Sequence, residues 1–232
     1  MKKIIVLTGA GMSAESGIST FRDSGGLWDK YPVEQVATPE GFARDPKLVL
    51  DFYNIRRKEL LSAKPNAGHE GLVELEKYFE VKIITQNIDN LHEQAGSSSV
   101  LHLHGELMKA QSVKNPDLIV ELTEKDNYEI RLGDKGSDGA QLRPFIVWFG
   151  EAVPMIEPAI ELSAQADIYV IIGTSLNVYP AAGLLNYVPK SVPVYLIDPQ
   201  EVAAYRDNIH FIRKGASEGV AELGEQLKKQ YL

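Results

Sequence analysis

A glycine-rich segment near the start of the chain has the residue types of a phosphate-binding loop. The apolar residues 4–7 lead into Gly9-Ala10-Gly11, and Ala14 occupies the third position of a dinucleotide fingerprint. A buried strand that ends in glycines and enters a helix presents backbone N–H groups to a pyrophosphate. Gly9 would permit the tight turn, and Gly11 would let the backbone approach the anion. An ordinary strand-to-helix turn has the same pattern, so this motif leaves both interpretations open.

The residues that follow combine two aromatic rings, a guanidinium and paired glycines between Phe21 and Trp28. An ordinary dinucleotide fold would instead reach a second strand with an acidic end about twenty residues after the glycines. Such a composition is typical of a mobile cover over a binding site, because glycines allow hinge motion and aromatics exclude water. The alternative is a surface loop whose Phe21 and Trp28 fill a gap in the core.

Polar side chains with catalytic potential follow two further apolar stretches. Gln86-Asn87-Ile88-Asp89 comes directly after residues 81–84, where a strand would deliver its side chains to a cleft. Asn87 or Asp89 could equally cap the next helix. Alternation puts His102 and His104 on one strand face, and Gly105 would end that strand. A histidine beside a glycine at a strand end is a candidate general base or a hydrogen-bonded structural residue.

Composition narrows the kind of protein. With 232 residues, 44% of them hydrophobic, the chain can bury a core of its own. A net charge of −8 without a basic cluster argues against a nucleic-acid or anionic-membrane partner. No apolar run is long enough to span a bilayer, and the first residues do not read as a signal peptide. We therefore expect a cytoplasmic protein, and we expect it to be a monomer.

The chain contains no cysteine, which excludes disulfides, a thiol nucleophile and a cysteine-ligated metal. Five histidines remain, and no two of them have the spacing of a helical zinc motif. We predict no metal site.

The elements that must position these residues follow from apolar periodicity. Continuous apolar runs predict strands buried on both faces, as a parallel sheet requires, at 4–7, 81–84, 144–149, 168–172 and 192–197. Helical spacing predicts helices at 46–62, 67–78, 157–165 and 220–231. The predicted fold class is α/β, a Rossmann-like parallel sheet with helices on both faces plus a small module formed by two insertions.

We expect one domain, residues 1–232, built from two parts. The Rossmann-like part would comprise about 1–28, 67–105 and 144–232, and the small module about 29–66 and 106–143. Short strands are expected in the module at 118–122 and 128–132. A ligand cleft is predicted between the two parts, at the carboxyl ends of the parallel strands.

In this order, the motifs resemble those of the sirtuins, the NAD-dependent protein deacylases, over almost the whole chain. The matching residues are Gly9-Ala10-Gly11 with Ser13, Gly17 and Ile18; Phe21-Arg22; Pro65-Asn66 with His69; Gln86-Asn87-Ile88-Asp89; His104-Gly105; Arg143-Pro144; Val147-Trp148-Phe149-Gly150-Glu151; Gly173-Thr174-Ser175-Leu176; and Val178-Tyr179-Pro180-Ala181.

The resemblance implies NAD as the cofactor. The implied cofactor-binding residues are Gly9, Ala10, Gly11, Ser13, Gly17, Ile18, Phe21, Arg22, Trp28, Gln86, Asn87, Ile88, Asp89, Gly173, Thr174, Ser175, Asp198 and Ala216. Asp198 stands where the family usually has asparagine, and a plain turn before Pro199 is the alternative interpretation of it.

The implied chemistry is displacement of nicotinamide from the ribose by the carbonyl oxygen of an acyl-lysine, giving free lysine, nicotinamide and O-acyl-ADP-ribose. The implied catalytic residues are His104, as the base for a ribose hydroxyl, with Asn87 and Asp89. An acyl-lysine peptide would pair as an added strand with a groove formed by Val147, Phe149, Gly150, Glu151, Leu176, Asn177 and Val178.

Tyr53 and Arg56 stand three residues apart, so both can face the same side of a helix. In sirtuins that remove succinyl, malonyl or glutaryl groups, a Tyr-x-x-Arg pair binds the acyl carboxylate, and this spacing matches. An arginine and a phenol suit a carboxylate well. The alternative is a solvated basic cluster of Arg56, Arg57 and Lys58.

The chain departs from the family at its zinc site, because most sirtuins carry two Cys-x-x-Cys pairs where residues 106–143 have none. Packing would then have to hold the small module together. Three other functions remain open: a protein ADP-ribosyltransferase or NAD hydrolase, a dehydrogenase, and a catalytically silent NAD sensor. The missing second strand with an acidic end disfavours the dehydrogenase, and the presence of Asn87, Asp89 and His104 together disfavours the sensor.

Overall fold

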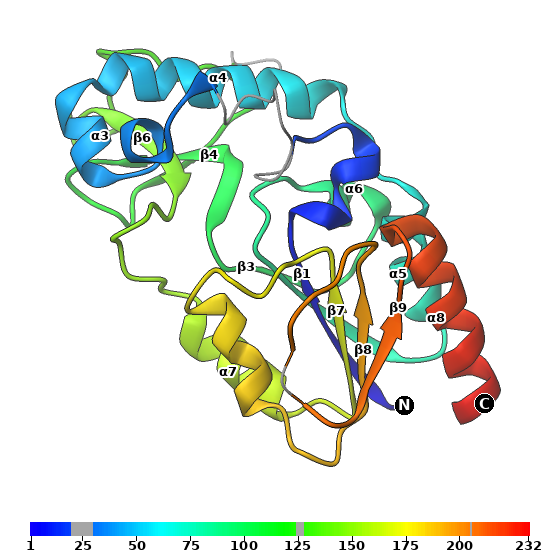
Figure 1. Cartoon of the computed structure of the whole chain (residues 1–232). Helices are drawn as coiled ribbons and strands as arrows, with labels where there is room; N and C mark the ends of the chain where they lie inside the picture. Colours follow the sequence, from blue (N-terminus) through cyan, green and yellow to red (C-terminus); the bar gives the residue numbers. More distant parts are fainter. Residues whose placement is uncertain (20–29, 124–127, 205) are drawn as a thin grey trace.

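Parallel strands form the main sheet of the protein (Figure 1), in a computed structural model that describes residues 1–19, 30–123, 128–204 and 206–232. Within these residues the sheet has the strand order β3-β2-β1-β7-β8-β9. The strands are β1 (Lys3–Thr8), β2 (Glu80–Thr85), β3 (Val100–His102), β7 (Ile168–Ile172), β8 (Val194–Ile197) and β9 (Ile209–Ile212). The chain first adds β2 and β3 on one side of β1 and later adds β7, β8 and β9 on its other side. The order therefore reverses between β1 and β7, and ligands bind at the carboxyl ends of the strands at such a topological switch point.

Helices cover both faces of this sheet, as predicted. On one face, α5 (Ala67–Leu75) and α8 (Ala216–Tyr231) pack on Ile4 and Val6 of β1. On the other, α7 (Ile156–Ala164) and the 3₁₀ helix η4 (Ala181–Tyr187) pack around Ile5 and Leu7. Successive residues of β1 thus enter opposite cores, which explains its continuous apolar run.

The small module is built on an antiparallel sheet with the order β5-β4-β6, and Figure 1 shows it with α3 and α4 at the other end of the molecule. Its elements are α2 (Val33–Val36), α3 (Pro39–Arg44), α4 (Pro46–Ser62), β4 (Gly105–Ser112), β5 (Ile119–Glu121) and β6 (Leu142–Ile146). Helix α4 has the predicted bounds, since Asp45 caps it and Pro46 begins it. Its apolar face packs Phe52 and Tyr53 against Leu107, Ile146 and Trp148.

Three predictions about elements are wrong. Residues 144–149 do not form a strand of the parallel sheet, because 142–146 pair with β4 as β6 and bury only alternate side chains. Residues 128–132 form no strand, because the side chain of Asn54 takes both backbone groups of Ile130. Strand β3 ends at His102 rather than continuing through His104 to Gly105, and Gly105, with φ +81°, opens β4 instead.

No helix in the described part of the chain is long and apolar enough to cross a membrane. The same residues contain no cluster of three His, Asp or Glu side chains that could hold a metal ion.

Candidate active site

A cleft of about 680 Å³ lies at the carboxyl ends of the parallel strands, where the sheet meets the small module. It brings together most residues that the sequence predicted for a site. From the cofactor and catalytic sets it is lined by Gly9, Ala10, Gly11, Ser13, Ile18, Gln86, Asn87, Ile88, Asp89, His104, Gly173, Thr174, Ser175 and Asp198. From the substrate set it is lined by Tyr53, Arg56, Val147, Phe149, Gly150, Glu151 and Val178.

Four predicted site residues do not line the cleft. Gly17 ends a 3₁₀ turn with φ +83°, so its role is conformational. Ala216 begins α8 inside the core, and its neighbour Gly215 lines the cleft instead. Leu176 packs on the core under the sheet, and Asn177 lies next to it outside the lining. Phe21, Arg22 and Trp28 lie outside the described residues, so their predicted roles stay predictions.

Glycines form the floor of the cleft where the loops after β1 and β7 cross. The N–H of Gly9 donates to Ile172 and that of Gly11 to Gly173, both at 2.9 Å. A Cβ atom on Gly11 would lie 2.6 Å from the Cα of Gly173, which itself has φ +61°. These glycines therefore have a further reason, because they allow two backbones to touch. Neither of their N–H groups is left over for an anion, contrary to the expectation of free N–H groups at these two positions.

The chain after Gly9 also differs from the expected strand-to-helix turn. It forms two short 3₁₀ helices, η1 (Ala10–Met12) and η2 (Ala14–Ser16), rather than one long helix. Glu15 then reaches across and accepts the N–H of Ser217 at 3.1 Å, which caps α8. This carboxylate ties the glycine loop to the helix that follows β9.

Asn87, Ser13 and Asp89 form a buried hydrogen-bonded group. The Asn87 amide donates to the carbonyl of Gly9 at 3.1 Å and to the Ser13 hydroxyl at 3.2 Å. Ser13 donates in turn to Oδ2 of Asp89 at 3.0 Å. Asp89 also accepts the N–H of Leu91, the first residue of α6 (Leu91–Ala95), although the N-cap residue of that helix is Asn90 rather than Asn87 or Asp89. Burial raises the pKa of Asp89, and these bonds oppose that rise.

His104 stands just after β3, with its Nδ1 3.0 Å from the carbonyl oxygen of Gln86. A carbonyl only accepts, so Nδ1 carries the proton and Nε2 keeps its lone pair. Burial lowers the pKa of His104 and outweighs the effect of this carbonyl, so the ring is neutral near pH 7. A neutral imidazole with a free lone pair in a cleft can act as a general base.

Tyr53 and Arg56 lie on the cleft wall formed by α4. The indole Nε1 of Trp148 donates to the Tyr53 hydroxyl at 3.0 Å, which leaves the phenol proton able to donate to a ligand. Burial raises the pKa of Tyr53 to about 12, so the phenol stays protonated. Burial also lowers the pKa of Arg56, against the opposing effects of Tyr53, Glu59 and Asp89.

The basic run on α4 does not form a solvated cluster, although the sequence left that interpretation open. Lys58 is exposed, but Arg57 is fully buried. Its Nε donates to the Leu107 carbonyl and its Nη1 to Asn54, both at 2.8 Å. Arg57 therefore joins α4 to β4, while Arg56 faces the cleft.

Trp148 is a residue to which sequence reasoning assigned no role. The Arg143 guanidinium lies 3.5 Å from the centre of its ring and pairs with both carboxylate oxygens of Glu151, at 2.7 and 3.0 Å. Glu151 also accepts the N–H of Trp148 at 2.8 Å. The carboxylate predicted to contact a peptide is thus engaged within the chain, where it fixes the segment that holds Phe149 and Gly150. The sequence signal available for this contact was the position of Arg143 five residues before Trp148.

Comparison with known proteins gives one consistent result. The sequence profile of the Sir2 family matches residues 9–180. A protein of Bacteroides thetaiotaomicron named NAD-dependent protein deacylase is 67% identical over 231 residues, which is 98% of each chain.

Solved structures agree in fold. A Sir2 homologue in complex with NAD superposes with a TM-score of 0.88 at 36% identity, covering 99% of this chain and 90% of that one. A Sir2 variant with a deacetylated p53 peptide and 3′-O-acetyl ADP ribose has a TM-score of 0.77 at 29% identity, covering 98% and 93%.

Proposed function

The chain belongs to the Sir2 family and is an NAD-dependent protein deacylase, and we propose that acyl-lysine is cleaved in the cleft between its main sheet and its small module. One observation carries the proposal. The bond from His104 to the Gln86 carbonyl leaves a basic nitrogen in a cleft that also holds buried Asn87 and Asp89. We also propose the division of the chain into a Rossmann-like part and a small module, with β6 assigned to the small module.

The cleft fits NAD. Its floor is glycine backbone, packed so closely that a Cβ on Gly9 or Gly11 would collide with the Gly173–Thr174 segment. Its inner end carries the Asn87, Ser13 and Asp89 group. When bound, NAD supplies a ribose carbon that can be attacked as nicotinamide leaves. The residues proposed to hold it are Gly9, Ala10, Gly11, Ser13, Ile18, Gln86, Asn87, Ile88, Asp89, Gly173, Thr174, Ser175 and Asp198, with Phe21, Arg22 and Trp28 kept as predictions.

His104 holds and moves the proton. Its Nε2 accepts a proton from a substrate hydroxyl while Nδ1–H stays bonded to Gln86, so the resulting positive charge is stabilised by a fixed carbonyl. Asn87 and Asp89 keep their orientation through Ser13 and Gly9. This preorganisation matters because an amide oxygen is a weak nucleophile and depends on accurate placement.

We assign the acyl end of the substrate to the wall of α4. The free phenol proton of Tyr53 and the guanidinium of Arg56 suit a carboxylate at the end of the acyl chain, as in succinyl or malonyl groups. The peptide part would lie along the apolar rim, where Phe149 is 48% and Val178 is 38% exposed.

Packing and hydrogen bonds take the place of a metal in the small module. The chain has no cysteine, so its side chains do not fit a sirtuin zinc site. Leu50, Ala110, Ile130 and Leu142 form a buried cluster there. Asn54 joins α4 to Ile130 through two bonds of 2.9 Å.

Mass spectrometry of one lysine peptide, acetylated or succinylated and incubated with NAD, tests the function. The wild type should release the free peptide, nicotinamide and O-acyl-ADP-ribose. A gain of ADP-ribose on unacylated protein would favour the transferase, and NAD binding without nicotinamide release would favour the sensor.

A further inference from the structure

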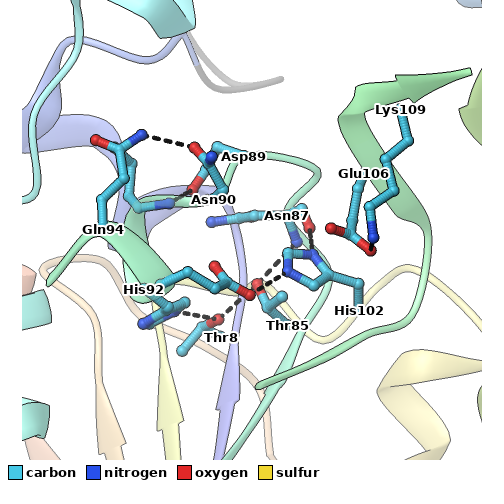
Figure 2. Close-up of polar contacts among 12 residues, drawn as sticks. Thr8, Thr85, Asn87, Asp89, Asn90, His92, Gln94, His102, Glu106 and Lys109 are labelled. Carbon is cyan, nitrogen blue, oxygen red and sulfur yellow. Dashed lines mark hydrogen bonds and ion pairs between the residues drawn. The ribbon is translucent and has the colours of Figure 1, made fainter. Parts of the chain in front are cut away.

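His102, two residues before the proposed base, bridges two acceptors. Its Nδ1 lies 3.1 Å from the carbonyl oxygen of Asn87, and its Nε2 lies 2.8 Å from a carboxylate oxygen of Glu93 on α6. The His102 side chain is only 8% exposed. Figure 2 shows its ring beside Asn87, with Glu106 and Lys109 of β4 on its other side.

Both bonds require a donor on the ring. The Asn87 carbonyl can only accept, so Nδ1 must carry a proton. Glu93 is 40% exposed, and its bond to His102 lowers the pKa of its carboxyl although burial opposes this. The carboxylate is therefore ionised and also accepts, so Nε2 carries a second proton. His102 is an imidazolium, whereas His104 has only one acceptor and is neutral.

The two histidines hold consecutive carbonyls of the segment that lines the cleft. Gln86 is bound by His104 and Asn87 by His102, while the carbonyl of Ile88 accepts the N–H of Leu107 at 2.7 Å. Loss of one His102 proton would leave a neutral ring that can donate to only one of its two acceptors, the Asn87 carbonyl or the Glu93 carboxylate. The side-chain amide of Asn87, which donates to Ser13 and Gly9, belongs to the same residue as this carbonyl, so the position of one affects the other.

We propose that His102 is a positioning residue, a protonated imidazole fixed between Glu93 and the Asn87 carbonyl that keeps Asn87 and Asp89 in place for the deacylase reaction. This rests on the proposed function, because Asn87 and Asp89 act in that same site. The imidazolium also lies near enough to Asp89 to favour its carboxylate form against burial.

The charges around His102 determine the pH at which it works. Glu93 of α6 and Glu106 of β4 act on His102 directly. His102 also interacts electrostatically with Asp89, in the loop before α6, and with His92 of α6. Lys109 of β4 acts on Glu93. Burial lowers the pKa of His102, but Glu93, Glu106 and the Asn87 carbonyl together raise it above the ordinary value. With a raised pKa, the cation persists to higher pH than in a free imidazole and is lost as the pH rises through the raised value.

Nitrogen-15 spectra of the histidine rings test the protonation state without any turnover. In a pH titration the wild-type His102 should lose its second ring proton only above pH 6.5, whereas His104 should lose its second proton below pH 6.5. Glu93→Gln keeps an acceptor but removes the charge, so its His102 should lose that proton at a lower pH than in the wild type. A wild-type His102 ring that becomes neutral below pH 6.5 would overturn the proposal, whether or not the protein deacylates any peptide.

The pH dependence of kcat/KM for NAD tests positioning. E93Q should lose kcat/KM at a lower pH than the wild type, on the order of tenfold where its ring is neutral and the wild-type ring is still charged, because a neutral ring no longer favours the Asp89 carboxylate. His102→Gln should be reduced at every pH. Glu74→Gln, which removes a similarly exposed carboxylate on α5, is the matched control and should follow the wild type. An E93Q profile equal to the wild type, with thermal unfolding unchanged, would refute the positioning role. Loss of all turnover in the wild type would refute the proposed function instead.

Discussion

The carbonyl oxygen of Gln86 lies 3.0 Å from Nδ1 of His104, and that contact determines which ring nitrogen is basic. Because Nδ1 must donate, the lone pair is on Nε2. A backbone carbonyl at the end of β2 thereby sets the chemistry of a side chain that follows β3.

We expect His104→Ala to lose turnover of acetylated and succinylated peptides alike, by about 10²- to 10⁴-fold, because the base is gone. Mass spectrometry of product peptide measures this. The exposed His210 on β9 provides the control, since His210→Gln should keep wild-type rates. Comparable losses in both variants would contradict the role of His104.

Wild-type activity should fall on the acid side only below pH 6.5. Burial lowers the pKa of His104, so its neutral form persists to lower pH than in a free imidazole and is lost as the pH drops through the lowered value. A profile of kcat/KM for the acylated peptide measures this limb. An acid limb centred above pH 7 would disagree with the buried ring.

Arg56→Met should reduce kcat/KM for the succinyl peptide about 10- to 100-fold and leave the acetyl peptide within about threefold, because only the first carries a carboxylate for the guanidinium. Lys58→Met removes an exposed charge two residues along the same helix and should change neither. Equal losses on both acyl forms in the arginine variant would exclude the acyl-carboxylate role.

Gly11→Ala should abolish NAD binding measured by calorimetry and lower the unfolding temperature. Its Cβ would lie 2.6 Å from the Cα of Gly173, so one of the two crossing loops must move. At Gly183 an added Cβ meets nothing closer than 3.8 Å, so Gly183→Ala should behave as the wild type. Normal NAD affinity in G11A would show that the crossing does not shape the site.

A chelator such as EDTA should leave the unfolding temperature unchanged, because no cysteine is present to bind zinc. A drop in the unfolding temperature on adding the chelator would reveal a metal that packing does not replace.

Asn54→Ala should destabilise the protein by about 1 to 3 kcal/mol, because Ile130 and Arg57 lose buried partners. Urea unfolding measures this loss of stability, with Lys58→Ala as the exposed control on α4.

Much of the fold could be predicted because β1, β7 and β8 are buried on both faces and therefore read as unbroken apolar runs, and β2 is interrupted only by the half-buried Lys82 between Val81 and Ile83. The apolar run at 144–149 led to the wrong prediction of a parallel-sheet strand, because that prediction equates an unbroken apolar run with burial on both faces. Leu142, Pro144 and Ile146 are buried, but Arg143 and Phe145 between them are only half-buried, which marks a strand covered on one face. The strand predicted around Ile130 failed because a distant amide, that of Asn54, satisfies its backbone.

The candidate site was predictable as a set of residue types, since His104, Asn87 and Asp89 follow strands whose ends meet. The charge of each histidine could not be predicted, because it depends on which acceptors elsewhere in the chain contact its ring. His102 owes its second proton to Glu93 on a neighbouring helix, and nothing in the spacing of the two residues indicates it.

The stack of Arg143 on Trp148 has a consequence for how this chain can diversify. The indole of Trp148 donates to Tyr53 at the proposed acyl end, and the backbone N–H of Trp148 donates to Glu151 at the rim proposed for the peptide. A mutation at any of Arg143, Trp148 or Glu151 would therefore alter the choice of acyl group and the choice of protein target together. Changes at Arg56 would affect the first choice alone, so descendants of this sequence can trade one acyl group for another while keeping their targets.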